Sequence, residues 1–404
     1  MNGRIFLTSY GGGHAQIIAA LVPALQSAGF ETDTIGLTTA YALLRRQGVA
    51  AKSVEALLVP EQDRRWLSLA ERFLGESAHP DITESQTRAY FALGLRDLAL
   101  EMGEEAAIER VEDQGRMAFC PVDAFRRYFR RTTPDLVIST TSPRFELAAQ
   151  LGAHAEGIPG LAVGDLFLEH ERQWILQPGY ARQLAVLSEP VRRSMEDDGF
   201  AGQIRATGNP AFDRLAIVAQ DEPRRRELRA ALGIGQKRLV LCPASSSSHA
   251  KNGQAFLSPA TFARKMEALC RRRPELTYMM RAHPNAPFEM PSECKSGHNP
   301  DSSVMSVEDA ILAADLVFVE CSTVGLQAAL MGRPVVCLGF ADYAVYPRYG
   351  LAHVVDDLDE AIDRIDQFTS LPSEGAGIPP LGTATDSVIG YVTDIITAHD
   401  PGKS

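Results

Sequence analysis

Paired cysteines are absent from this chain of 404 residues. The six cysteines include no Cys-x-x-Cys pair and no zinc-like spacing. Cys242, Cys321 and Cys337 lie within or beside apolar runs, a setting typical of buried, reduced thiols in a cytosolic protein. The pattern therefore disfavours a disulfide scaffold and a zinc module.

Long apolar runs and an excess of basic charge are missing as well. No run approaches the roughly eighteen residues that a membrane span needs, and the first residues lack the pattern of a secretory signal. The net charge of −11 disfavours nucleic acid as the main partner, because a phosphate backbone requires a basic face. We expect a cytoplasmic protein. Its local basic patch is interpreted as an exposed helix face, and contact with lipid headgroups at the inner membrane is the alternative; the patch consists of Arg126, Arg127, Arg130 and Arg131.

Two signatures of cofactor and metal binding do not occur. The glycine run near the N-terminus is not G-x-G-x-x-G, and no acid follows at the spacing that dinucleotide-binding proteins use. The chain also has no evident D-x-D metal motif. We therefore expect neither a cofactor nor a metal site.

Apolar strands alternate with helical segments over most of the chain. A strand at 4–9, a glycine loop, a helix ending near Gly29 and a second strand open a parallel α/β series. A polar, mainly helical stretch at 39–131 is expected to cover the first sheet and could include an inserted helical subdomain, and a second series begins at Lys237. The sequence predicts two Rossmann-like domains, 1–214 and 215–404, facing each other across a cleft. The last helix is expected to cross back to the first half.

The first candidate residues follow the first strand. Gly11, Gly12 and Gly13 allow close approach of the backbone to a ligand, and the helix behind them offers free N–H groups. His14 would lie at the rim of the cleft, where an imidazole can act as a general base. The alternative is a tight turn with His14 as a helix cap or surface residue.

Two more candidates follow later strands of the first half. Asp165 stands at the end of the strand in "LAVGDLF", where a carboxylate can deprotonate an acceptor hydroxyl. A solvated surface charge is the alternative. Thr141, after "PDLVIST", is expected to line the same cleft.

The second half carries the candidate phosphate site. An apolar strand ends at Glu320, and Ser322, Thr323 and Gly325 then open a helix whose first turn presents N–H donors. Gln327 lies one turn further, where its amide could hold ribose hydroxyls. An ordinary strand-to-helix turn is the alternative.

Two further loops of the second half could reach the same ligand. Arg281 and His283 follow the strand "LTYMM", and His283 could donate to a phosphate or pack on a base. Ser245 and Ser246 follow the strand "LVLCPA", where hydroxyls can bind phosphate. Each loop could equally be a surface loop without a ligand.

Three stretches of the chain resemble the GT-B glycosyltransferase superfamily. The loop 11–14 resembles the first glycine loop of the peptidoglycan N-acetylglucosaminyltransferase. The stretch "TGNPAFD" at 207–213 resembles the hinge of UDP-N-acetylglucosamine 2-epimerases, and "STVGLQAALMGRP" at 322–334 resembles the nucleotide-sugar turn and helix of the superfamily. The resemblance implies an acceptor-binding first domain and a second domain that binds a nucleotide sugar.

The chain departs from these relatives at two places. Gln327 stands where the superfamily usually has a glutamate that binds ribose. Ser139, Thr140 and Thr141 stand where the epimerases carry an acid, which disfavours the epimerase reaction. The pair at His283 also resembles transferases that use cytidine nucleotides, so both UDP- and CMP-sugars stay open.

We therefore expect a metal-independent glycosyltransferase of bacterial glycan or glycoconjugate synthesis. His14 or Asp165 would act as the base, and the acceptor would be a glycan, a lipid-linked sugar or a small molecule. One alternative is a nucleotide-sugar 2-epimerase or hydrolase on the same fold. The other is a protein that binds a nucleotide sugar without catalysis.

Overall fold

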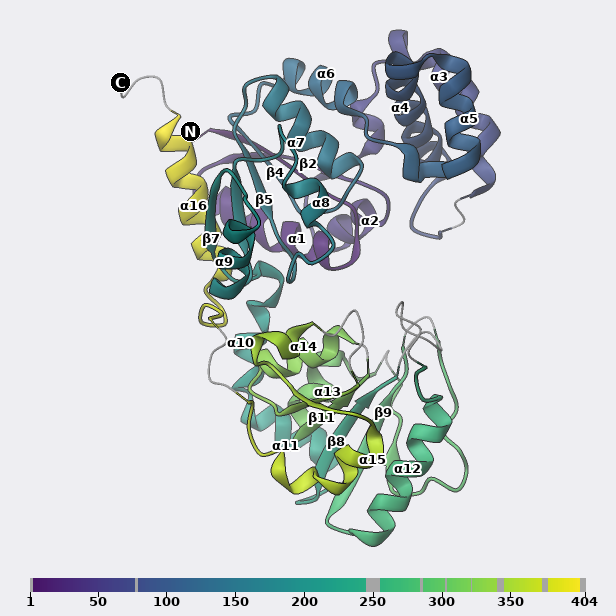
Figure 1. Ribbon diagram of the computed structural model, residues 1–404, viewed down its shortest axis with the longest axis vertical. Helices are drawn as coiled ribbons and strands as arrows, with labels where there is room; N and C mark the ends of the chain where they lie inside the picture. The colour runs from purple at the N-terminus through teal and green to yellow at the C-terminus, as the bar shows by residue number, and fades with distance from the viewer. Residues whose placement is uncertain are drawn as a thin grey trace. The chain divides into compact units, whose positions relative to one another are not determined.

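The computed structural model describes residues 3–76, 79–244, 255–283, 286–301, 304–320, 322–339, 345–372 and 377–399. The chain forms two compact units: Met1–Ala211 with Gly377–Ser404, and Phe212–Ala376. Each unit is built on one parallel sheet packed against helices (Figure 1). The predicted class of two Rossmann-like α/β domains is confirmed. Within the described ranges, no helix is both long and apolar enough to cross a bilayer.

The first unit contains a seven-stranded parallel sheet in the order β3-β2-β1-β4-β5-β6-β7. Its strands are β1 (Arg4–Ser9), β2 (Glu31–Gly36), β3 (Ala51–Ser53), β4 (Leu136–Ser139), β5 (Gly160–Val163), β6 (Gln183–Val186) and β7 (Gln203–Ala206). The strand order reverses between β1 and β4. Ligands of open α/β sheets bind outside the carboxyl ends of the strands at such a switch point.

The helices of the first unit cover both faces of this sheet, and three of them lie beside it. They are α1 (Gly12–Ser27), α2 (Thr39–Arg46), α3 (Pro60–Ala70), α4 (Glu84–Met102), α5 (Glu104–Gln114), α6 (Val122–Thr132), α7 (Phe145–Ala155), α8 (Arg172–Ile175), α9 (Glu189–Asp197) and α16 (Ala384–Ala398). Alternate residues of β1 point to opposite faces, as the period of a strand requires. Phe6 packs with Phe125 and Phe129 of α6 on one face, and Ile5 and Leu7 pack with α1 on the other.

The predicted helical insertion consists of α3, α4 and α5, which form a group beside the sheet (Figure 1). A capping box fixes the start of α4, because Thr83 and Gln86 each bond the other's backbone N–H. Gly94 lets α4 approach Phe119, since a Cβ atom at Gly94 would lie 2.3 Å from that ring. These local features hold the insertion against the rest of the first unit.

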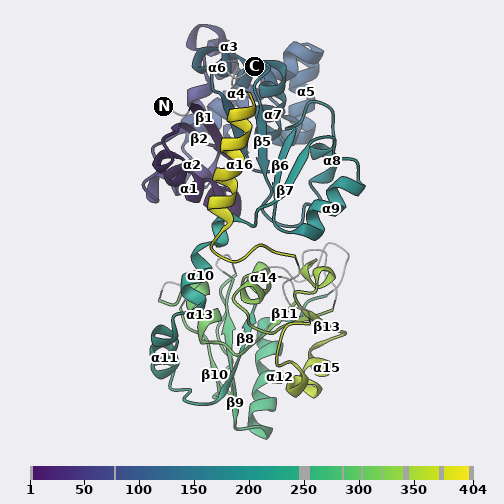
Figure 2. The same ribbon diagram turned by 90° about the vertical axis from the view of Figure 1, so that its left-hand side faces the viewer.

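The last helix, α16, packs against α1 of the first unit (Figure 2). Val388, Val392 and Ile395 of α16 are buried in the same cluster as the apolar face of α1. The Tyr391 hydroxyl donates a hydrogen bond to Gln183 Oε1 at 2.8 Å. The chain thus returns to the first unit after the second unit is complete.

The second unit contains a six-stranded parallel sheet in the order β10-β9-β8-β11-β12-β13. Its strands are β8 (Arg238–Pro243), β9 (Leu276–Arg281), β10 (Gly297–His298), β11 (Leu316–Val319), β12 (Val335–Leu338) and β13 (His353–Val355). Its helices are α10 (Arg214–Ala219), α11 (Glu222–Ala231), α12 (Pro259–Arg272), α13 (Val307–Ala313), α14 (Thr323–Leu330) and α15 (Leu358–Asp363). Here the strand order reverses between β8 and β11.

Candidate functional site

The glycine loop lies at the carboxyl end of β1, at the switch point of the first sheet. Gly11 must be a glycine for steric reasons, because a Cβ atom there would lie 2.1 Å from Thr39 Oγ1. Gly12 has φ +56°, a left-handed conformation that glycine adopts without strain. A Cβ atom at Gly13 would meet no atom within 4 Å. The loop is thus tightly packed at Gly11 and open at Gly13.

His14 and Asp165, predicted as alternative bases, lie next to each other. His14 is in the first turn of α1, and its Nε2 atom is 3.5 Å from Oδ2 of Asp165, which follows β5. The two side chains are 21% and 19% exposed. His14 Nδ1 is buried without a hydrogen-bond partner in the described part of the chain. A substrate could therefore reach Nε2 and the Asp165 carboxylate, but not Nδ1.

Glu146 is a fully buried carboxylate in the first turn of α7. It accepts hydrogen bonds from the Tyr10 N–H at 2.8 Å, the Ser142 N–H at 3.2 Å and the Thr140 hydroxyl at 2.5 Å. Burial raises the pKa of Glu146 above its ordinary value, and His14 and these hydrogen bonds oppose the rise. Glu146 thus ties the glycine loop to the end of β4 and contributes negative charge near His14.

A third carboxylate, Glu171, belongs to the same group. Burial raises the pKa of Glu171, and the charge of Asp165 raises it further. His14 opposes this effect, as it does at Glu146. One imidazole therefore interacts with three carboxyl groups at the carboxyl edge of the first sheet. Perturbed carboxyls of this kind concentrate at functional sites.

Some buried polar atoms at the same edge have no hydrogen-bond partner among the described residues. Besides His14 Nδ1, they include Ser9 Oγ at the end of β1 and Thr141 Oγ1 after β4. Ser9 and Thr141 are fully buried. Nearly all buried polar atoms in proteins have a hydrogen-bond partner, so each exception needs an explanation. A ligand bound at this edge would explain these atoms, because it could supply the missing hydrogen-bond partners.

Unfavourable backbone conformations mark the same region. Thr38, Arg144 and Leu168 have φ angles of 44°, 67° and 59°, in a range that favours glycine. They follow the carboxyl ends of β2, β4 and β5, respectively. Such residues cost on the order of 1–3 kcal/mol each and persist where the surrounding structure imposes them, often at functional sites.

Asn209, in the stretch that resembles the epimerase hinge, holds the backbone of Asp165. Its Nδ2 atom donates to the Asp165 carbonyl at 2.5 Å, and its Oδ1 atom accepts from the Ala211 N–H at 2.9 Å. Asn209 is buried, with 5% exposure. The sequence marked this stretch as a turn, but only the structure shows its contact with the candidate base.

In the second unit, Ser322 caps helix α14. Its hydroxyl accepts from the Val324 N–H at 3.2 Å and keeps its own proton to donate. Thr323 is exposed and Gln327 is half-buried. Gly325 must be a glycine because a Cβ atom there would lie 2.2 Å from the hydroxyl of Tyr346. The capped helix starts beside the switch point of the second sheet, as expected of an anion site.

The other residues predicted for the second unit are less well defined. Arg281, at the end of β9, donates to the Met305 carbonyl at 2.8 Å. His283 follows it and forms an isolated bridge with Ala286. Ser245 and Ser246 lie outside the described residues. Within the described ranges, no group of three or more His, Cys, Asp or Glu side chains could hold a metal ion.

The four arginines of the predicted basic patch all have partners inside the first unit. Arg126 and Arg130 pair with Glu156, and Arg127 pairs with the buried Asp63. The fourth, Arg131, donates to a backbone carbonyl. Glu156 and Asp63 thus balance part of the charge of these four arginines.

Sequence reasoning named His14, Asp165, Thr141 and the helix start at Ser322, but it missed Glu146. The signal was present, since Glu146 is an acid in the first turn of a helix that follows a strand. What the sequence could not show is that this helix start lies against the glycine loop, more than 130 residues away.

No family model matches the chain. The lipid-A-disaccharide synthase of Azoarcus sp. is 28% identical over 240 residues, which cover 53% of this chain. The match spans 58% of that curated relative's length.

Solved structures resemble the chain over nearly its whole length. The UDP-GlcNAc 2-epimerase of Neisseria meningitidis has a TM-score of 0.59 and 11% identity, and covers 97% of this chain and all of its own. A putative UDP-N-acetylglucosamine 2-epimerase of Listeria monocytogenes has a TM-score of 0.60 and 15% identity, and covers 98% of each chain. The chain therefore shares the two-domain fold of these solved structures, as the sequence motifs predicted.

Proposed function

We propose that this protein is a glycosyltransferase that moves a sugar from a nucleotide-sugar donor to an acceptor hydroxyl. A UDP-sugar is the favoured donor, and a CMP-sugar is the other candidate. The observation that carries the proposal is the His14–Asp165 pair at the switch point of the first sheet. The sequence similarity to a lipid-A-disaccharide synthase supports a transferase.

In this proposal the pair removes the proton of the acceptor hydroxyl. Asp165 is assigned as the base, because its carboxylate is partly exposed, whereas Nδ1 of His14 is buried and Nε2 lies against Asp165. His14 then orients the carboxylate through Nε2, and Glu146 holds the loop that carries His14. The geometric requirement is that the base lies within hydrogen-bond reach of the proton it takes.

The donor would bind the second unit at the start of α14. Ser322 and Thr323 would donate hydroxyl protons to phosphate oxygens, and the helix dipole would favour the negative charge that develops on the leaving nucleotide. Gln327 would contact the ribose. Arg281 and His283, after β9, would lie nearer the phosphate or the base.

The test of the base is a pair of isosteric variants, Asp165→Asn and His14→Gln. Each should lower kcat, Asp165→Asn by roughly 10²–10⁴-fold because general base catalysis is worth about that much. Donor affinity, measured by calorimetry, should stay unchanged. Asp113→Asn, an exposed position on α5, is the matched control. If both variants turn over within twofold of the wild type, the pair is not the base.

An epimerase or hydrolase reaction remains the second candidate, and one observation favours it. Asp165, Glu146 and Glu171 form the carboxylate group that such a reaction would need near the sugar. Incubation with donor alone separates the two reactions. Free nucleotide and an altered sugar without acceptor would favour the epimerase, whereas turnover that requires an acceptor would favour the transferase.

The nucleotide is identified by thermal shift against UDP-, GDP-, dTDP- and CMP-sugars. A ligand that binds the native state raises its melting temperature according to its concentration and affinity. We expect the largest shift with a UDP-sugar. Tight binding without turnover under any of these conditions would instead support a non-catalytic nucleotide-sugar-binding protein.

A further inference from the structure

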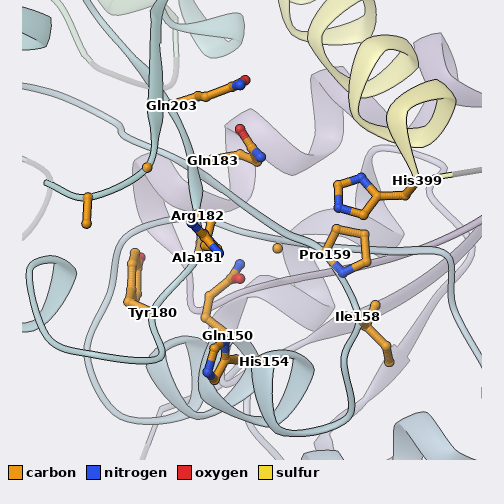
Figure 3. Close-up of a pocket in the computed structure, with 13 residues that line it drawn as sticks. Gln150, His154, Ile158, Pro159, Tyr180, Ala181, Arg182, Gln183, Gln203 and His399 are labelled. Atoms are coloured by element: carbon orange, nitrogen blue, oxygen red, sulfur yellow. The ribbon is translucent and has the colours of Figure 1, made fainter.

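A cavity lies at the amino ends of the strands of the first sheet, opposite the carboxyl ends where the candidate base lies. It has a volume of about 370 Å³ and is bordered by the first residues of three strands, Gly160, Gln183 and Gln203. That volume lies at the lower end of the range for small-molecule sites. Figure 3 shows amide and imidazole side chains around this cavity. None of the residues assigned to the proposed transfer reaction lines it.

Gln150 provides a buried acceptor at the floor of the cavity. Its Nε2 atom donates to Ser139 Oγ at 2.9 Å and to the Leu161 carbonyl at 3.1 Å, which fixes the orientation of the amide. Its Oε1 atom has no hydrogen-bond partner in the described part of the chain, although Gln150 is only 1% exposed. Gly160 leaves room for this oxygen, since a Cβ atom there would lie 2.2 Å away. A buried amide oxygen of this kind calls for a ligand that donates a hydrogen bond.

Gln183 provides the complementary group. Its Oε1 atom already accepts from the Tyr391 hydroxyl at 2.8 Å, so its amide nitrogen is the atom left to donate. One wall therefore offers an acceptor and another a donor. A hydroxyl group can satisfy both, because it donates one hydrogen bond and accepts two. Several hydroxyls on one small molecule would match the amides that line the cavity.

The charge at the rim is positive in a chain whose net charge is −11. Arg182, His154 and His399 line the cavity, and none of the described residues that line it is Asp or Glu. All three are exposed at the rim. The Arg182 guanidinium has no ion pair within the described ranges, unlike Arg126, Arg127 and Arg130 of α6. An unpaired guanidinium presents its donors in the geometry that phosphate and carboxylate oxygens fit.

We propose that this cavity binds a hexose phosphate. The sugar hydroxyls would bond the amides of Gln150 and Gln183, and the phosphate would lie at the rim against Arg182 with the two imidazoles. The proposal does not rest on the transferase reaction, because the candidate base lies at the other edge of the sheet. Gln150 also donates a hydrogen bond to Ser139, and the next residue, Thr140, donates one to Glu146. A ligand bound to Gln150 would therefore contact the network of buried polar groups that includes Glu146.

The test is calorimetric titration of the full chain with glucose 6-phosphate, glucose 1-phosphate and N-acetylglucosamine 1-phosphate. Glucose and inorganic phosphate are the comparison ligands. We expect at least one hexose phosphate to bind at least tenfold more tightly than either comparison ligand. Binding should weaken at least tenfold in Arg182→Ala, which removes the phosphate partner, and in Ala201→Trp, which fills the cavity from its exposed wall.

Two controls make the outcome specific. Arg226→Ala removes the same charge from an exposed position on α11 and should leave the affinity unchanged. Ser322→Ala combined with Thr323→Ala should also leave it unchanged, which separates this site from the proposed donor site on α14. Thermal unfolding checks that each variant is folded. The proposal is overturned if no hexose phosphate binds, if both cavity variants bind as the wild type does, or if inorganic phosphate binds equally well.

Discussion

Replacing Asn209 with alanine removes two hydrogen bonds of a buried side chain, one of which holds the backbone of the candidate base. The lost bonds are those to the Asp165 carbonyl at 2.5 Å and from the Ala211 N–H at 2.9 Å. A typical hydrogen bond contributes about 1 kcal/mol, and a buried group left without a partner costs about 1–3 kcal/mol. Asn209 is 5% exposed, so water replaces these bonds poorly. We expect Asn209→Ala to destabilise the first unit by roughly 2–4 kcal/mol.

The same change should affect turnover more than binding. Asp165 would lose the contact that fixes its backbone, and a base displaced by about 1 Å can lower the rate about 10²-fold. The assay is urea unfolding of the first unit together with kcat and donor affinity. Asn209→Asp keeps the acceptor for Ala211 and should fall between the wild type and Asn209→Ala. Asn299→Ala, which removes one amide hydrogen bond in the second unit, is the matched control. Wild-type stability and kcat in Asn209→Ala would refute the reasoning.

The remaining predictions concern one buried carboxyl and the donor site. Burial raises the pKa of Asp97 to about 7, so this group contributes stability that is present at low pH and is lost as the pH rises from about 4 towards 8. Asp97→Asn should abolish this loss of stability, which is at most roughly 4 kcal/mol, while the control Asp113→Asn should retain it. If the free energy of unfolding of wild type and Asp97→Asn changes in parallel between pH 4 and 8, the assignment is contradicted. Ser322→Ala combined with Thr323→Ala should weaken nucleotide binding by roughly 1–3 kcal/mol in calorimetry, and an unchanged affinity would remove α14 from the site.

Local patterns in the sequence were enough to predict the class of fold. The apolar run at 4–9, the glycines after it and the helical spacing that follows are properties of neighbouring residues, and they correspond to β1 and α1. The helix start at Ser322 was recognised in the same way, because a hydroxyl after an apolar strand caps the helix that it precedes. Such signals can be recognised without knowledge of the rest of the chain.

The order of the strands was decided by the tertiary structure alone. Because β1 pairs with both β2 and β4, the loop at Gly11 meets residues that follow it by more than 130 positions. The His14–Asp165 pair, the burial of Glu146 and the cavity beside Gln150 all depend on that pairing. Periodicity reports which face of a strand is buried, but it carries no information on which strand lies beside it. The sequence thus determined the elements and their strand-end residues, and the packing of distant segments determined which of those residues meet.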